Sequence, residues 1–346
     1  MEYNFLGLSD VKVSRICLGT MTFGQQNSLN DAFGQLDLAE DMGVNFIDTA
    51  EMYPVPAYPD TQGRTEAYVG EWLYSRKNRH KFVLATKITG PGLHVKHVAD
   101  NMVFSERRFE EAIHNSLLRL KTDYIDLYQI HWPERKTNCF GKLGFSVDTQ
   151  DEWSDNINEV VEILQKFKNE GKIRHWGISN ETPWGTMRYM QESKKFSDFQ
   201  FLSIQNPYNL VNRTFEIGLA EMAYRENFGL LAYSPLAFGL LSGKFHEGRS
   251  KPSDRLHQFK NMARYNSPVT FEVVRKYLDI ANQNGISMAK MSLAYLLTKS
   301  FVSSVIIGAT DNIQLKENIE SIHVKLSDEI LNEIELVHKD FSNPAP

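Results

Sequence analysis

The feature that most constrains this chain is an alternation of short apolar runs, rich in β-branched residues, with amphipathic segments. Eight such runs occur, at residues 16–20, 46–49, 82–87, 125–131, 173–179, 202–208, 230–235 and 304–310. Apolar strands separated by helices are typical of parallel strands that are buried on both faces. Eight units of this kind close naturally into an α/β fold of the (β/α)8 TIM-barrel type. An open, doubly wound sheet is the competing arrangement.

The pattern also predicts what is added to the barrel. No break in composition marks a second domain, so we expect residues 1–346 to form one barrel domain. A hairpin is expected at residues 3–13 and an extra helix at 327–341. Long irregular loops at 54–63, 133–152 and 238–268 follow the second, fourth and seventh strands. Loops that follow strands gather at the C-terminal face of a barrel, where such folds carry their sites.

Composition excludes several classes of protein. The net charge is −5, which does not favour nucleic acid as a partner. The sequence contains no run of 18 apolar residues, which is about the length that a membrane-spanning helix needs. The first residues lack the basic and apolar regions of a signal peptide. The sequence has two cysteines, Cys17 and Cys139, so a disulfide framework is not expected. We therefore expect a cytoplasmic protein with no membrane and no required protein partner.

Polar residues at the ends of three neighbouring strands indicate a site. Asp48 ends the second run, Lys87 the third and His131 the fourth, while Tyr53 follows in the loop after Asp48. A buried lysine is costly unless it is paired, and Asp48 is its evident partner. One alternative is a purely structural ion pair with two satisfied core groups. Four groups converging on one cavity favour a catalytic site.

These residues and the motifs around them resemble the aldo-keto reductases, and most closely their bacterial Tas-like subgroup. The resemblance runs from about residue 5 to residue 322. It includes EMYPVP at 51–56, HWP at 131–133 and NCFGKLG at 138–144. Asp48, Tyr53, Lys87 and His131 match the catalytic tetrad of that family in order and in strand position.

The resemblance implies reduction of an aldehyde or ketone by hydride transfer from NADPH. Tyr53 would donate the proton, and Lys87 would lower its pKa from a usual value near 10. Asp48 would hold Lys87, and His131 would orient the substrate oxygen. The substrate would contact Tyr53, His131 and Trp132. Further pocket walls are expected from Met21, Phe140 and Phe145.

The cofactor would be held without the Gly-x-Gly-x-x-Gly fingerprint of dinucleotide folds, which we do not find. The resemblance implies that Ser179, Asn180 and Gln205 bind the carboxamide. Tyr233 would stack on the nicotinamide. Two alternatives are that Ser179-Asn180 caps the next helix and that Tyr233 belongs to the core. The other residues implied to bind NADP(H) line the nicotinamide half (Gly19, Thr20, Met21, Asp48), the pyrophosphate (Ser234, Leu236, Gly239, Leu240, Ser242, Lys244, Arg255) and the adenosine phosphate (Gly308, Thr310, Gln314, Glu317, Asn318).

The adenosine end departs from the family pattern. Many members carry a lysine in place of Gly308 and an arginine in place of Gln314. This chain therefore lacks two charge-assisted contacts to a 2′-phosphate. We still expect NADPH as the cofactor, because related barrels with this glycine use it.

Two other functions compete with a reductase. One is a cofactor-binding regulatory barrel with little turnover, since barrels resembling this one also serve as channel subunits. The other is a lyase in which Lys87 forms a Schiff base. A metal site is not expected, because His94 and His97 have no cysteine or carboxylate framework around them. The expected partner is a small-molecule carbonyl substrate.

Overall fold

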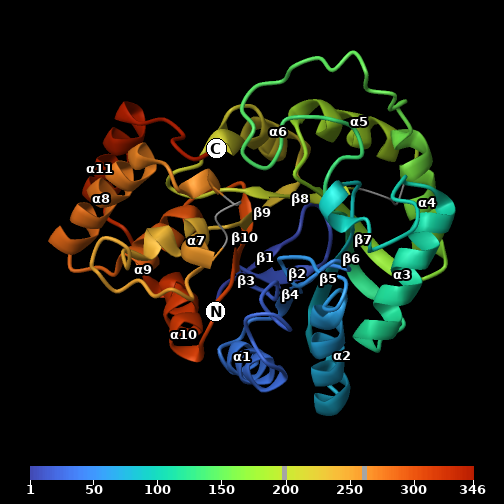
Figure 1. The fold of residues 1–346 in the computed structure, drawn as a ribbon, viewed down its shortest axis with the longest axis horizontal. Helices are drawn as coiled ribbons and strands as arrows, with labels where there is room; N and C mark the ends of the chain where they lie inside the picture. Colours follow the sequence, from blue (N-terminus) through green and yellow to red (C-terminus); the bar gives the residue numbers. More distant parts are fainter. Residues whose placement is uncertain (197–200, 259–262) are drawn as a thin grey trace.

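The computed structural model describes residues 1–196, 201–258 and 263–346, and its centre is a closed barrel of eight parallel strands (Figure 1). The prediction of a (β/α)8 barrel is confirmed, and each predicted run contains a strand whose ends lie within a few residues of the expected ones. The strands are β3 (Ile16–Gly19), β4 (Phe46–Asp48), β5 (Val83–Ile88), β6 (Ile125–Ile130), β7 (Ile173–Ser179), β8 (Phe201–Pro207), β9 (Gly229–Tyr233) and β10 (Val302–Ile307).

Helices surround the barrel, and their ends follow local chemistry. The helix α3 (Glu106–Leu120) begins where the Ser105 hydroxyl accepts the backbone N–H of Arg108, as predicted, and it buries Phe109 and Ile113. The other α-helices of the described residues are α1 (Leu29–Asp41), α2 (Arg64–Arg76), α4 (Ile157–Asn169), α5 (Pro183–Ser193), α6 (Leu219–Glu226), α7 (Arg255–Gln258), α8 (Pro268–Gln283), α9 (Met288–Leu297), α10 (Asn312–Glu320) and α11 (Asp328–Asp340). The expected final helix is α11.

The N-terminal hairpin closes one end of the barrel. It consists of β1 (Tyr3–Phe5) and β2 (Lys12–Ser14), as predicted. Its Leu6 and Val13 are fully buried and pack with interior side chains of the barrel such as Phe46 and Leu127. Because this apolar plug fills the N-terminal half, polar side chains in the barrel interior collect at the C-terminal mouth.

Strand register aligns the polar layer. Gly19 pairs with Asp48, Asp48 with Ala85, and Lys87 with Gln129 across neighbouring strands. Parallel strands in this register bring the ends of β4, β5 and β6 together at one level.

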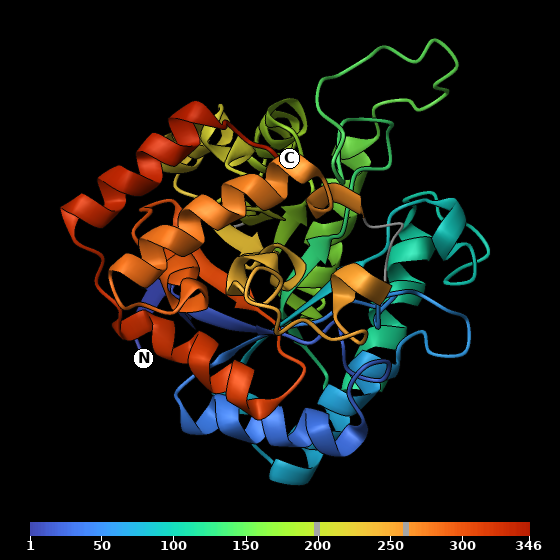
Figure 2. The ribbon, with the colours of Figure 1, turned by 60° about the vertical axis from the view of Figure 1, so that its left-hand side comes forward.

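The connections at this mouth are long. The connection after β6 projects from the molecule as an irregular loop (Figures 1 and 2). The connection after β9 was expected to be irregular, but it holds short helices. These are α7 and two 3-10 helices, η4 (Ala237–Ser242) and η5 (Ala263–Tyr265). No described helix is long and apolar enough to cross a membrane.

Candidate active site

A buried ion pair lies at the C-terminal mouth of the barrel. The Lys87 side chain is fully buried, and its Nζ lies 2.6 Å from Asp48 Oδ2 and 2.7 Å from the carbonyl oxygen of Thr49. The same Nζ lies 5.0 Å from the centre of the Tyr53 ring, which meets the His131 ring edge-on at 5.5 Å. The structure therefore brings together all four residues predicted to form the catalytic cluster.

Two glutamines hold the second carboxylate oxygen of Asp48. The side-chain amides of Gln129 and Gln205 donate to Oδ1 at 3.1 Å and 2.9 Å, and Gln205 also donates to Gln129 at 3.1 Å. The sequence prediction missed Gln129. The available signal was strand alternation, since a residue two positions before His131 shares its face. Gln205, expected to bind the carboxamide, directs its amide N–H groups to the cluster.

Burial and the charge of Lys87 have opposite effects on the pKa of Tyr53. Burial raises the pKa of the Tyr53 phenol, the Lys87 ammonium lowers it, and the net pKa lies above the usual value. For Lys87, burial lowers the pKa, but Asp48 and Tyr53 together raise it by more than burial lowers it. The net pKa is raised, so the amine stays charged. The expected lowering by Lys87 is thus present but is outweighed by burial. At neutral pH Tyr53 is a protonated phenol beside a cation.

His131 is held as a neutral imidazole. Burial, followed by the charges of Lys87 and His94, holds the His131 pKa well below its usual range. Its backbone carbonyl accepts the side-chain amide of Asn180 at 2.8 Å. Its Nδ1 has no hydrogen-bond partner among the residues that the structure describes. A neutral ring can donate from one nitrogen only, so it can serve as a single hydrogen-bond donor to a substrate oxygen.

An aromatic wall adjoins the cluster. Trp132 donates its indole N–H to the carbonyl of Pro91 at 2.9 Å, and its ring meets those of His131, Phe140 and His94 at 4.8, 5.7 and 5.9 Å. Met21 packs against the same group. The expectation for Phe145 is wrong, because that side chain is 68% exposed on the projecting connection.

A second buried pair supports the segment that carries Tyr53. Glu51 accepts a hydrogen bond from the Arg108 guanidinium and another from the backbone N–H of Thr89, and both side chains of the ion pair are buried. The sequence prediction also missed this pair, because its members are 57 residues apart. It ties the loop after β4 to α3 and so fixes the chain two residues before Tyr53.

The residues expected to bind the nicotinamide half lie next to the cluster. Ser179 donates to the carbonyl of Gln205 at 2.7 Å, and the Tyr233 hydroxyl donates to Asn180 Oδ1 at 2.6 Å. The helix-cap alternative for Ser179-Asn180 is wrong, because Thr182 caps α5. Tyr233 is half-buried and packs against the barrel-interior cluster, so both a stacking surface and a place in the core remain open to it. Thr20 donates to the carbonyl of Asp48 at 2.8 Å.

The segment expected to hold the pyrophosphate forms a tight turn. Gly239 has a φ of +91°, and a Cβ there would lie 3.3 Å from Lys244 Nζ, which pairs with Asp254 at 2.6 Å. Ser242 donates to the carbonyl of Gly239. Burial lowers the pKa of Arg255 to about 10. The charge of Arg255 in turn lowers the pKa of Tyr53. Ser234, Leu236 and Leu240 lie in the same connection.

The expected adenosine seat lies at the start of α10. Gln314 folds onto the helix cap, donating to Asp311 at 2.7 Å and accepting from the Thr310 hydroxyl at 3.2 Å. Asn318 donates to the carbonyl of Gly308 at 3.3 Å, and Ser287 donates to Glu317 at 2.6 Å.

The backbone beside this seat is open at Gly308, which is exposed. A Cβ at Gly308 would meet only the carbonyl oxygen of Gly19, at 3.9 Å. The open backbone at Gly308, the glycine turn at Gly239 and the polar ends of β7 and β8 offer the hydrogen-bonding groups that an anionic dinucleotide needs. Among the described residues, no group of three or more His, Cys, Asp or Glu side chains could hold a metal ion.

Fold and site together define a (β/α)8 barrel with a buried acid–base centre at its C-terminal mouth. The family model described as the aldo/keto reductase family matches residues 15–339. The chain belongs to this family, and it is an oxidoreductase of a class that generally uses nicotinamide cofactors and acts on small molecules.

Relatives cover nearly all of the chain. It is 46% identical to "Protein tas" of Escherichia coli over 352 aligned residues, with all of both chains covered. It is 36% identical to an "Aldo-keto reductase" of Babesia bovis over 279 residues, covering 76% of this chain and 98% of that one. It is 30% identical to a "Probable voltage-gated potassium channel subunit beta" of Arabidopsis thaliana over 353 residues, covering 97% of this chain and 96% of that one.

Proposed function

We propose that the protein is an NADPH-dependent reductase of aldehydes or ketones, with Tyr53 as the proton donor. The observation that carries this proposal is the buried Lys87 ammonium, paired with Asp48 and adjacent to the rings of Tyr53 and His131. An acid with a cation beside it, in a site of low dielectric constant, is what a developing alkoxide requires.

The residues divide the chemistry as follows. The chemistry that NADPH would supply when bound is a hydride for the carbonyl carbon. Tyr53 gives its phenolic proton to the carbonyl oxygen, so that C=O becomes CH–OH, and the Lys87 ammonium stabilises the phenolate left behind. His131 donates a hydrogen bond to the same oxygen before transfer. Asp48, held by two amides, keeps Lys87 charged and in place.

Three further points belong to this proposal. The aromatic wall of Trp132 and Phe140 favours apolar or aromatic carbonyl substrates. NADPH is favoured over NADH on the family resemblance, although Gln314 and Gly308 supply no cation. Both cysteines are free, which suits a reducing compartment, and we place the protein in the cytoplasm with no metal ion.

A regulatory barrel is the second candidate, and the similarity to a protein named as a channel subunit supports it. The complete acid–base cluster counts against it, because cofactor binding alone does not need a buried charged lysine. The lyase alternative is weaker. A Schiff base forms from a neutral amine, whereas Lys87 has a raised pKa and donates to two acceptors.

The test is an assay of NADPH oxidation with a panel of aromatic and aliphatic aldehydes and ketones. The reductase proposal predicts steady turnover with members of the panel and formation of the matching alcohol. Tight NADPH binding with no turnover on any member would instead indicate a regulatory barrel. Covalent trapping of a carbonyl compound on Lys87 by borohydride would indicate a lyase.

A further inference from the structure

The connection between β6 and α4 is anchored at its two ends, and between them Phe140 packs against Trp132 and Asp148 pairs with Lys136. At its start, Arg135 pairs with Glu181 at 2.6 Å, and at its end Trp153 packs edge-on against Trp184, with ring centres 6.3 Å apart. Every residue from 140 to 150 is exposed. Figures 1 and 2 show this segment, which we call the arm (residues 138–151), arching away from the barrel. The arm is therefore positioned to contact something outside its own barrel.

The tip of the arm has the pattern of a strand with one apolar face. Leu143, Phe145 and Val147 alternate with Gly144 and Ser146, so an extended chain would present the three apolar side chains on one side. These three side chains are 65%, 68% and 77% exposed. Large apolar side chains grouped in this way on a projecting segment are typical of a contact surface.

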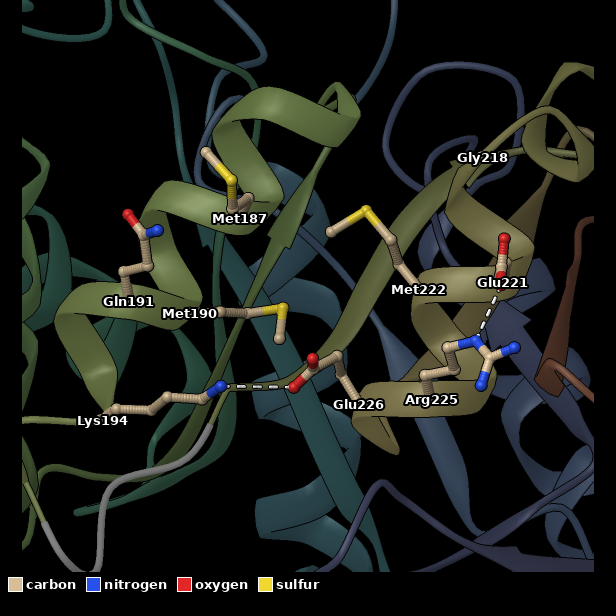
Figure 3. A pocket seen from close by; sticks show the side chains of 9 residues that line it. All are labelled: Met187, Met190, Gln191, Lys194, Gly218, Glu221, Met222, Arg225 and Glu226. Atoms are coloured by element: carbon tan, nitrogen blue, oxygen red, sulfur yellow. Dashed lines mark hydrogen bonds and ion pairs between the residues drawn. The ribbon is translucent and has the colours of Figure 1, made fainter.

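The same chain carries an open groove between α5 and α6, with an apolar floor (Figure 3). Met187, Met190 and Met222 line it, and it encloses about 350 Å³. Unbranched methionine side chains adapt to different apolar shapes. Charged side chains stand on the rim: Lys194 and Glu226 form an ion pair across the groove at 3.4 Å, and Glu221 pairs with Arg225 on α6.

We propose that the arm of one copy docks into the α5–α6 groove of a second copy, and that the two reciprocal contacts form a two-fold dimer. Charge supports this pairing, because the exposed Lys142 precedes the apolar tip and Glu221, about 70% exposed, stands on the rim that would receive it. Reciprocal use of one surface pair is the geometry of an isologous dimer.

The area is sufficient for a weak dimer. Three exposed side chains of this size would bury roughly 300–400 Å² per arm. Two arms and the groove surfaces that they cover then approach the ~1,200 Å² at the lower end of stable interfaces. Docking of the arm into the groove of its own chain is the competing arrangement, and the outward course of the arm disfavours it.

The first test is sedimentation of the full chain and of three single-substitution variants. We expect the native protein to form dimers at micromolar concentration, and both Phe145→Ser in the arm and Met222→Glu in the groove to be monomers. Tyr224→Ser, also on α6 and 74% exposed but outside the groove, should remain dimeric. An equimolar mixture of the arm and groove variants should form more dimer than either variant alone and less than the native protein, because one of the two reciprocal contacts remains intact. A monomeric native protein, or dimers in both variants, would overturn the proposal.

The second test separates the two docking modes. In a Cys139→Ser background, Ser146→Cys in one chain and Gln191→Cys in another should form a disulfide between the chains when mixed. Cys17 is fully buried and should not compete. The reverse charge pair, Lys142→Glu with Glu221→Lys, should dimerise more tightly than either single variant. A third variant carries both Ser146→Cys and Gln191→Cys in one chain. A disulfide that forms only within this chain, and not between the two single variants, would show docking in cis and would overturn the dimer.

Discussion

Replacing Lys87 by methionine separates the structural role of the buried charge from its catalytic role. The change keeps the length of the side chain but leaves Asp48, which is 2% exposed, with only its two amide donors. Removal of one partner from a buried ion pair costs about 3–5 kcal/mol. We expect Lys87→Met to lose that much of the free energy of unfolding, and to lose turnover by at least about 100-fold because Tyr53 no longer has a cation beside it.

The matched control is the double variant Lys87→Met with Asp48→Asn. It removes both charges, so the carboxylate is no longer buried without its partner. We expect it to recover more than half of the lost stability and none of the lost turnover. Unfolding in urea, followed by the fluorescence of the five tryptophans, and the NADPH oxidation assay give the two values. A double variant no more stable than Lys87→Met would show that the unpaired carboxylate is not the source of the loss.

Three further predictions concern the same site. Gln129→Leu removes one hydrogen bond to the charged Asp48, so the free energy of unfolding, measured in urea, should fall by about 1.5–3 kcal/mol. In steady-state kinetics kcat should fall with KM nearly unchanged. A change in KM alone would contradict this. Gln314→Arg should tighten NADPH binding on the order of tenfold and leave NADH binding unchanged in fluorescence titrations, because it adds a charge-assisted contact to the 2′-phosphate; equal effects on both cofactors would contradict it. The His131 pKa is depressed in the folded state, so its contribution to stability is present above the ordinary value near 6.5 and is lost as the pH falls below it. Between about pH 7 and pH 5 the native protein should therefore lose more stability than His131→Gln, and equal losses would refute this assignment.

The elements that could be predicted were those with a strong local pattern. The β-branched runs and the cap at Ser105 are local signals, and both matched the structure. The short helices after β9 were missed because three to six residues are too few to show periodicity. The position of Phe145 was also beyond local reasoning, since apolar residues in a long loop can face either inward or outward.

Of the candidate site, the four residues with distinctive chemistry lie together as predicted, and the side chains that support them were not predicted. A lysine ending an apolar strand needs a partner, which led to Asp48. Gln129 was missed because strand alternation places it only on the face of His131, whereas its hydrogen bond to Asp48 spans 81 residues of sequence. The Glu51–Arg108 pair depends in the same way on how α3 packs beside β5.

The central claim is that Tyr53 supplies the proton, and single-turnover kinetics of Tyr53→Phe test it most directly. NADPH-loaded protein is mixed with a carbonyl substrate, and the oxidation of the bound cofactor is followed. We predict that Tyr53→Phe binds NADPH within a few-fold of the native protein and oxidises it at least about 100-fold more slowly. Oxidation at the native rate in this variant would contradict the account.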